Sequence, residues 1–233
     1  PVPSSGGMGV LAGMVAGLCG LSLLGEPVAD ALQTAPLAGI AAFTLFAALL
    51  GWADDVYRLP ASVKLVALLA GAVFAIVIGP RPEMLWAAGA GAALPWALSA
   101  AVAAAFIFLM ANAVNFMDGA NGIAMGTALI VLLSLSVVLV PGAVFSVQAD
   151  PVAILIALLL AAAASLAAFL VWNLQGKLFA GDAGSLSVGG LIGGASLMFA
   201  IDGPLLIPLT LCLPILIDVF LTLAWRCLLY TSD

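Results

Sequence analysis

Apolar runs of about 18 residues or more recur along the whole length of this chain, and each is long enough to cross roughly 30 Å of hydrocarbon as an α-helix. Charged residues make up only 7% of the 233 residues, too few to wet the surface of a soluble domain. The expected spans are residues 8–25, 36–53, 63–79, 95–113, 123–140, 152–172, 186–201 and 204–226. The pattern therefore predicts an all-α polytopic membrane protein with about eight transmembrane helices, forming one domain over residues 1–233.

The order of the spans places the connecting segments alternately on the two sides of a membrane. One side receives residues 1–7, 54–62, 114–122, 173–185 and the C-terminal end. Four of the five basic residues fall on that side, namely Arg58, Lys64, Lys177 and Arg226. Because Lys and Arg are enriched in cytoplasmic segments, this side is expected to be cytoplasmic. On the other side, segment 80–94 is expected to be an interfacial stretch or part of a longer helix.

Three segments on the expected cytoplasmic side carry acidic and amide side chains where apolar spans end. Their acids and amides are Asp54, Asp55, Asn112, Asn115, Asp118, Asn121 and Asp182. Carboxylates at a membrane face are costly unless they are hydrated, paired or bound to a metal. Oxygen ligands suit Mg²⁺, which takes one or two carboxylates and completes its shell with phosphate oxygens and water. The segments together predict a site for Mg²⁺ and a phosphate-bearing ligand.

Other residues of the same segments suit phosphate binding. Glycines such as Gly181 and Gly184, next to Ser185, permit close approach of the backbone to a phosphate. Arg58, Lys64 and Lys177 can neutralise phosphate charge. Each cluster taken alone also fits a solvated helix end or a capped turn. Their recurrence in three segments on one side favours a shared site.

A transporter or channel is the alternative function for a multi-pass chain of this kind. Transporters place polar residues near the middle of the membrane, and Asp218, inside the last span, fits that pattern. With no histidine in the chain, acid–base chemistry falls to carboxylates, lysine, tyrosine or water. The three cysteines form no C-x-x-C pair and are interpreted as helix-packing residues. No nucleic acid is expected as a partner.

Four motifs, in this order, resemble the polyprenyl-phosphate N-acetylhexosamine-1-phosphate transferase family, glycosyltransferase family 4. They are Pro3-Ser-Ser-Gly-Gly7, Gly51-Trp-Ala-Asp-Asp55, Asn115-Phe-Met-Asp-Gly-Ala-Asn-Gly-Ile-Ala124 and Phe179-Ala-Gly-Asp-Ala-Gly-Ser185. The family includes the phospho-MurNAc-pentapeptide translocase and the transferases that begin O-antigen and teichoic acid synthesis. A first span and a later histidine-bearing loop of that family have no counterpart here, so the chain is expected to be truncated at both ends.

The resemblance implies a Mg²⁺-dependent enzyme of the bacterial inner membrane. Such an enzyme transfers a sugar 1-phosphate from a UDP-N-acetylhexosamine to a polyprenyl (undecaprenyl) phosphate at the cytoplasmic face; whether it forms a homodimer is left open. By resemblance, Asp54, Asp55 and Asp118 are catalytic candidates, and Asn115 and Asp182 match the Mg²⁺ positions. The remaining candidates would bind substrate: Arg58, Lys64, Asn112, Asn121, Lys177, Gly181, Gly184 and Ser185. Asn121 replaces the second acid of an Asp-Gly-x-Asp-Gly pattern, which resembles the O-antigen and capsule branch more than the muramyl-pentapeptide branch.

Overall fold

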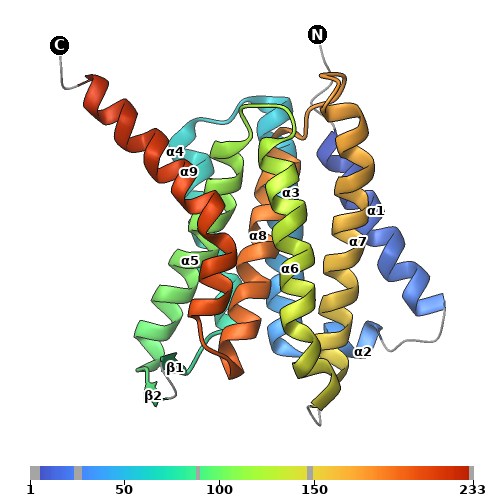
Figure 1. Cartoon of the computed structure of the whole chain (residues 1–233), viewed down its shortest axis with the longest axis vertical. Helices are drawn as coiled ribbons and strands as arrows, with labels where there is room; N and C mark the ends of the chain where they lie inside the picture. The colour runs from blue at the N-terminus through green and yellow to red at the C-terminus, as the bar shows by residue number, and fades with distance from the viewer. Residues whose placement is uncertain (1–5, 24–27, 88–89, 146–148, 231–233) are drawn as a thin grey trace.

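The chain folds into a bundle of long helices that run back and forth beside one another (Figure 1). The computed structural model describes residues 6–23, 28–87, 90–145 and 149–230. The helices are α1 (Gly6–Leu23), α2 (Val28–Leu32), α3 (Ala35–Tyr57), α4 (Ala61–Ile78), α5 (Trp96–Met117), α6 (Ile123–Phe145), α7 (Ala149–Asn173), α8 (Gly181–Asp202) and α9 (Leu206–Tyr230). Strands β1 (Met84–Ala87) and β2 (Ala90–Ala93) form a small antiparallel hairpin.

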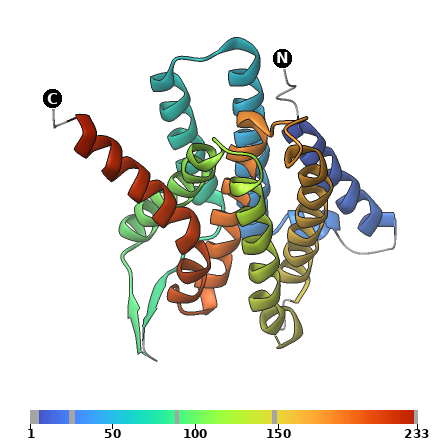
Figure 2. The same cartoon turned by 45° about the horizontal axis from the view of Figure 1, so that its top comes forward.

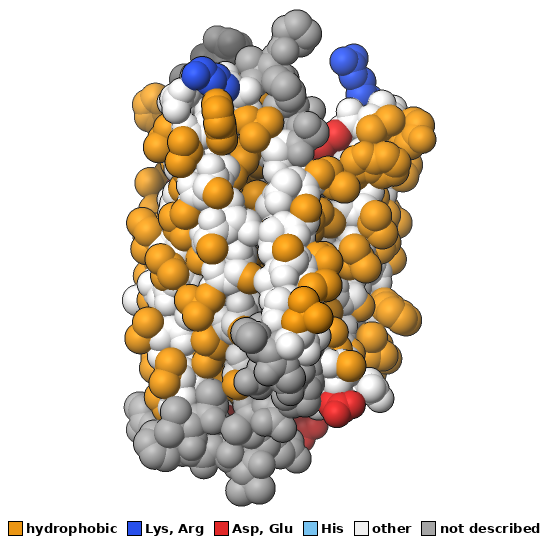
Figure 3. Space-filling model, turned by 90° about the vertical axis from the view of Figure 1, so that its right-hand side faces the viewer, with side chains coloured by type: hydrophobic (Ala, Val, Ile, Leu, Met, Phe, Trp, Pro, Cys, Tyr) orange, Lys and Arg blue, Asp and Glu red, His pale blue; other side chains and the backbone are white. Residues whose placement is uncertain are grey.

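The helices have the length and composition of membrane spans. Within the described residues, seven helices are long and apolar enough to cross a bilayer, and α1 contributes a shorter apolar stretch, Gly6–Gly20. On the face drawn in Figure 3, hydrophobic side chains cover the middle of the molecule and the charged ones lie toward its two ends. The prediction of an all-α polytopic membrane protein is confirmed.

Three helices reach further into the polar segments than hydropathy alone predicts. α3 continues to Tyr57 and α5 to Met117, while α8 begins at Gly181 rather than near residue 186. Hydropathy falls where charged residues begin, but the backbone hydrogen bonds of a helix continue until a cap stops them. The acids and amides of the three clusters consequently lie on or next to rigid helix ends. Segment 80–94 contains the two strands of the β-hairpin, so of its two expected alternatives the continuation of a helix is wrong.

Helix α8 occupies the centre of the bundle. In its most apolar stretch 83% of the residues are buried, against 22% to 44% in the other six long helices. Its glycines make this possible because they let neighbouring helices approach closely. Gly190 and Gly194 face Phe43 and Ile40 of α3, and Gly189 and Gly193 face Met110 and Ile107 of α5. The position of α8 therefore fixes where α3 and α5 end relative to its own N-terminus.

The connections that carry the polar clusters lie at one end of the bundle. Figure 2, which brings that end forward, shows the links from α3 to α4, α5 to α6 and α7 to α8 there. The start of α1 and the end of α9 lie at the same end in Figure 1, and the C-terminal part of α9 leans away from the bundle. The three clusters thus lie at one end of the bundle, as the order of the spans predicts.

The contact between α8 and α5 gives a test of the packing. A Cβ at Gly189 would lie 2.5 Å from the carbonyl oxygen of Met110 and 2.8 Å from Cα of Ala111, and backbone atoms cannot move aside easily. Gly189→Ala is expected to destabilise the protein by roughly 1–3 kcal/mol, as overpacking does. The measurement is the thermal unfolding midpoint in detergent. Gly126→Ala on α6, where a Cβ meets nothing within 4 Å, is the matched control; equal midpoints for the two variants would contradict the packing described.

Candidate active site

The last turn of α3 presents two adjacent acids, Asp54 and Asp55. The helix stops at Arg58, whose left-handed conformation (φ 54°) lets its N–H donate to the carbonyl of Asp54. The side chain of Asp54 closes the turn into α4, because its Oδ1 accepts a hydrogen bond of 2.8 Å from the N–H of Leu59. The end of α3 thus holds the Asp54 carboxylate in one orientation.

Lys64, in the first turn of α4, joins two of the clusters. Its ammonium donates a hydrogen bond of 2.9 Å to Asp54 Oδ2 and a second bond to Asp182 Oδ2. All three side chains are largely shielded, with 16% to 24% of each exposed. A shielded charge pair is less screened by salt and solvent than an exposed one. Lys64 therefore supplies positive charge between carboxylates from α3 and α8.

Asp182 also contacts the end of α5. Asn115 Nδ2 donates to Asp182 Oδ1 (2.9 Å) and to Ser185 Oγ (2.8 Å), and Ser185 Oγ donates in turn to the carbonyl of Gly181 (3.0 Å). These contacts place an amide, a carboxylate and a hydroxyl side by side, where α5 meets the first turn of α8. Asn115 and Asp182, the two residues that the family resemblance assigns to Mg²⁺, are therefore direct neighbours.

Asp55 has different partners from Asp54. Its Oδ1 accepts from the N–H of Asp182 (3.0 Å) and its Oδ2 from the N–H of Ala183 (3.3 Å). Both bonds run to the first turn of α8, where helix N–H groups have no partner within their own helix. The side chain of Asp55 is thus directed toward the backbone of α8.

Asp118 ends α5 and completes the acidic group. Its carboxyl accepts no hydrogen bond from any residue in the part of the chain described. Burial, followed by the negative charges of Asp182 and Asp55, raises the pKa of Asp118 to about 7. The four acids predicted as catalytic or metal-binding residues therefore share one electrostatic environment.

The chemistry of these donors fits a small hard cation better than a soft transition metal. Within the described residues, no three Asp, Glu, His or Cys side chains gather as a metal-binding group. Mg²⁺ does not need such a group, because it takes one or two carboxylates and fills its shell with water and phosphate. Asp182 offers a carboxylate, and Asn115, whose Nδ2 now faces Asp182, would offer its amide oxygen after a half-turn of the amide. The pair fits the predicted Mg²⁺ site.

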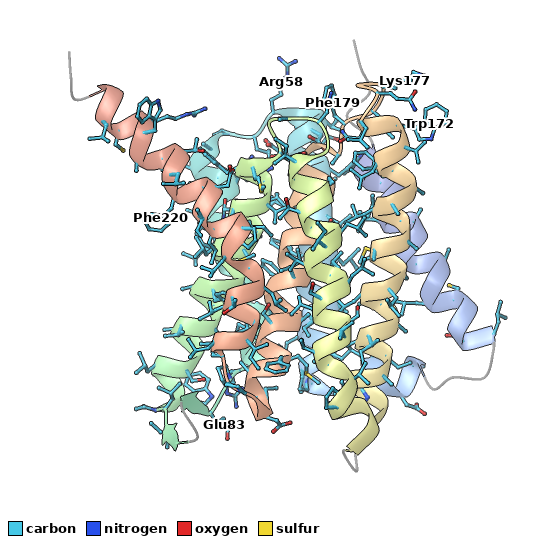
Figure 4. All side chains as sticks on the ribbon, viewed as in Figure 1. Arg58, Glu83, Trp172, Lys177, Phe179 and Phe220 are labelled. Atoms are coloured by element: carbon cyan, nitrogen blue, oxygen red, sulfur yellow. The ribbon has the colours of Figure 1, made fainter. Side chains whose placement is uncertain are left out.

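Two of the predicted phosphate-binding cations lie away from this group. Figure 4 shows Arg58 and Lys177 pointing outward at the same end of the molecule. Lys177 donates to Gln175 Oε1 (2.7 Å) and lies 5.6 Å from the centre of the Trp172 ring. Among the three predicted cations, only Lys64 contacts the acids. A role of Arg58 and Lys177 in substrate binding stays a prediction.

Several of the predicted amides and glycines likewise do not contact the acids. Asn112 donates to the carbonyl of Phe108 on its own helix (2.9 Å), and Asn121 is exposed. Gly181 has a left-handed backbone (φ 67°) that starts α8, while Gly184 packs against Gly7. Gly184 therefore serves helix packing, and its predicted contact with substrate stays a prediction.

The N-terminal motif also reaches the start of α8. The N–H groups of Gly6 and Gly7 donate to the carbonyls of Phe179 (3.0 Å) and Ala180 (2.9 Å). A Cβ at Gly7 would collide with the backbone of Gly184, so this position requires a glycine. Residues 3–5 of the motif lie outside the described residues.

Asn173 is a residue of the site region that was absent from the predicted set. It is 2% exposed; its Oδ1 accepts from the N–H of Gly122 (2.7 Å), and its Nδ2 donates to the carbonyl of Leu178 (2.8 Å). It thus ties the turn after Asp118 to the segment before α8. An asparagine directly after an apolar span was the available signal, since a buried amide needs partners.

Comparisons with known proteins identify a family and several relatives of this chain. The model of glycosyl transferase family 4 matches residues 37–200, from Leu37 in α3 to Ala200 in α8. A Bacillus subtilis protein named a probable undecaprenyl-phosphate N-acetylglucosaminyl 1-phosphate transferase is 28% identical over 81% of this chain and 49% of its own length. The phospho-N-acetylmuramoyl-pentapeptide-transferases of Mycobacterium ulcerans and Mycobacteroides abscessus are 33% and 29% identical, each over 83% of this chain and 62% of their own lengths.

The chain thus spans about half to three-fifths of the length of these relatives. The family match covers more than half of the chain and contains the acids of α3, the end of α5 and the start of α8. This chain belongs to glycosyl transferase family 4.

Proposed function

We propose that the protein transfers a sugar 1-phosphate from a UDP-N-acetylhexosamine to a polyprenyl phosphate and releases UMP. The observation that carries the proposal is the chain of contacts from Asp54 through Lys64 and Asp182 to Asn115, which joins the ends of four helices. The names of the relatives support the reaction class. The bias of basic residues to this end supports a cytoplasmic site, and the bacterial relatives support the plasma membrane.

In this reaction an oxygen of the lipid phosphate attacks the β-phosphorus of the UDP-sugar. The bond from that phosphorus to the bridging oxygen breaks, and UMP leaves with the bridging oxygen. Phosphoryl transfer of this kind is accelerated mainly by positioning and by neutralising charge. Side chains that are fixed on helix ends and shielded from solvent suit both tasks.

We assign Asp182 and Asn115 to holding Mg²⁺, which would neutralise charge on the diphosphate. Lys64 lies against Asp182, so its ammonium is placed to neutralise a phosphate oxygen beside the same carboxylate. Asp54 orients Lys64 through their hydrogen bond. Asp118, with a free carboxylate and a pKa of about 7, is suited to accept a proton from the lipid phosphate near neutral pH.

The transporter alternative has no comparable support. Its polar residues should line a path near the middle of the membrane, whereas the acids described here gather at helix ends. Asp218, the residue that suggested transport, is exposed on α9. The transferase accounts for the acidic group, and transport does not.

The proposal predicts which acids the reaction needs. Asp182→Asn, Asp54→Asn and Asp118→Asn are each expected to lower transfer of radiolabelled sugar phosphate from UDP-GlcNAc to undecaprenyl phosphate by about 10²-fold or more. Asp202→Asn, which changes an exposed acid at the opposite end of α8, should leave the rate unchanged. Full activity in the three site variants, or no transfer by the unaltered protein, would count against the proposal. Offering UDP-MurNAc-pentapeptide as a competing donor tests whether the enzyme belongs to the O-antigen and capsule branch, which Asn121 suggests, or to the muramyl-pentapeptide branch.

The pKa of Asp118 predicts how stability depends on pH. A carboxyl whose pKa is about 7 in the folded protein and near 3.8 when unfolded binds its proton more tightly when folded. It therefore stabilises the fold below about pH 4, and this contribution is lost as the pH rises to about 7. In EDTA, the thermal unfolding midpoint should decrease as the pH is raised from 5 to 8, and Asp118→Asn should make this decrease smaller.

Two additions make the pH experiment specific. Mg²⁺ at the site would favour the ionised carboxylate, so adding it should flatten the pH dependence of the unaltered protein. Asp202→Asn, at the other end of α8, should show the same change of unfolding midpoint with pH as the unaltered protein. An identical slope in Asp118→Asn and the unaltered protein would show that Asp118 is not the group responsible.

A further inference from the structure

The N-terminus of α8 is capped by another helix. Ala180 precedes α8 and makes no side-chain cap, so the first turn has no acceptor from its own sequence at the usual position. The carboxylate of Asp55 supplies it from α3, with bonds of 3.0 Å and 3.3 Å to the N–H groups of Asp182 and Ala183. A negative charge at a helix N-terminus is also favoured by the helix dipole.

A second contact, one helical turn away on α3, holds the same two residues. A Cβ at Gly51 would collide with the carbonyl of Asp182 and lie 2.5 Å from the nitrogen of Ala183. Residues four apart lie on one face of a helix, so Gly51 and Asp55 together form the surface on which α8 begins. α3 therefore determines both the distance and the direction of the first turn of α8.

Asp54 and Asp55 consequently have different partners and different roles, although they are neighbours in the sequence. Successive side chains on a helix point about 100° apart. Asp54 is directed to Leu59 and Lys64, whereas both oxygens of Asp55 are taken by the backbone of α8. A carboxylate held in this way has little freedom to take a proton from a substrate.

We infer that Asp55 is a positioning residue, which fixes Asp182 for cation binding by capping α8, and is not the base of the reaction. The inference rests on the proposed function, in which Asp182 holds a divalent cation. Asp182 is the point where Lys64 and Asn115 also meet, so a shift at the start of α8 disturbs all three contacts. Partners that orient a metal ligand typically change metal affinity by about 10- to 100-fold when removed.

The test is Mn²⁺ binding, measured by electron paramagnetic resonance on the protein in lipid nanodiscs, with Mn²⁺ as the probe in place of Mg²⁺. Asp55→Ala is expected to weaken Mn²⁺ binding by about 10-fold or more. Asp55→Asn keeps one carbonyl acceptor for α8 and should stay within about 3-fold of the unaltered protein, a partial rescue. Asp182→Ala provides the reference for loss of the ligand.

Gly51→Ala is the decisive companion variant because it changes no charge. It pushes the start of α8 away from α3, so it should weaken Mn²⁺ binding in the same direction as Asp55→Ala. If Asp55 instead acted through its charge or as a ligand, Asp55→Asn would weaken Mn²⁺ binding as much as Asp55→Ala does. Gly51→Ala would then leave Mn²⁺ binding unchanged. That result would overturn the inference.

Amide hydrogen exchange separates this inference from the proposed function. Loss of the cap in Asp55→Ala should speed exchange in the peptide that contains Asp182 and Ala183, whether or not a cation or substrate binds. Unchanged exchange would overturn the cap. If hydrogen exchange and Mn²⁺ binding change as expected but the unaltered protein transfers no sugar phosphate, only the proposed reaction is overturned and the cap stands. In transfer assays, high Mg²⁺ should largely restore kcat of Asp55→Ala, and a variant lacking the base would stay slow.

Discussion

The burial of α8 is the constraint on which the rest of this structure depends. A helix in the centre of a membrane bundle is surrounded by other helices, and only small residues let several of them approach at once. The glycines of α8 meet α3 on one side and α5 on the other. Once these contacts are made, the first turn of α8 lies between the ends of both neighbours. The polar group at that end is therefore a consequence of how the apolar part packs.

The charge balance of that polar group is consistent with the cation proposed above. Asp54, Asp55, Asp118 and Asp182 meet with Lys64 as the single basic side chain in contact with them among the described residues. Backbone N–H groups of α8 favour the charged form of Asp55, although burial still raises its pKa, and Lys64 is shared by Asp54 and Asp182. Burial, followed by the negative charges of Asp182 and Asp55, raises the pKa of Asp118, so part of the negative charge stays uncompensated there. Mg²⁺ would offset this negative charge and would in turn favour binding of a diphosphate beside it.

Much of this arrangement could be predicted from the sequence, and the reasons are physical. Apolar runs of bilayer length form membrane-spanning helices, and because consecutive helices alternate in direction, every second connection lies on the same side. That reasoning brought Asp54, Asn115 and Asp182 to one end. It could not predict that Arg58 and Lys177 point outward, because long exposed side chains are not fixed by helix order. The position of Asn173 after an apolar span signalled a need for partners, but the partners themselves, Gly122 and Leu178, could not be predicted because they lie in different connecting segments.

The pair Asp54–Asp55 shows most clearly what only the three-dimensional structure supplies. In the sequence the two residues are chemically identical and adjacent, and no property of the motif distinguishes their roles. The distinction arises from the rotation of α3 about its axis, which its packing against α8 sets through Gly51. That rotation gives one carboxylate to the ammonium of Lys64 and the other to the backbone of α8. The same packing that buries α8 in the membrane therefore also assigns the two acids their separate tasks.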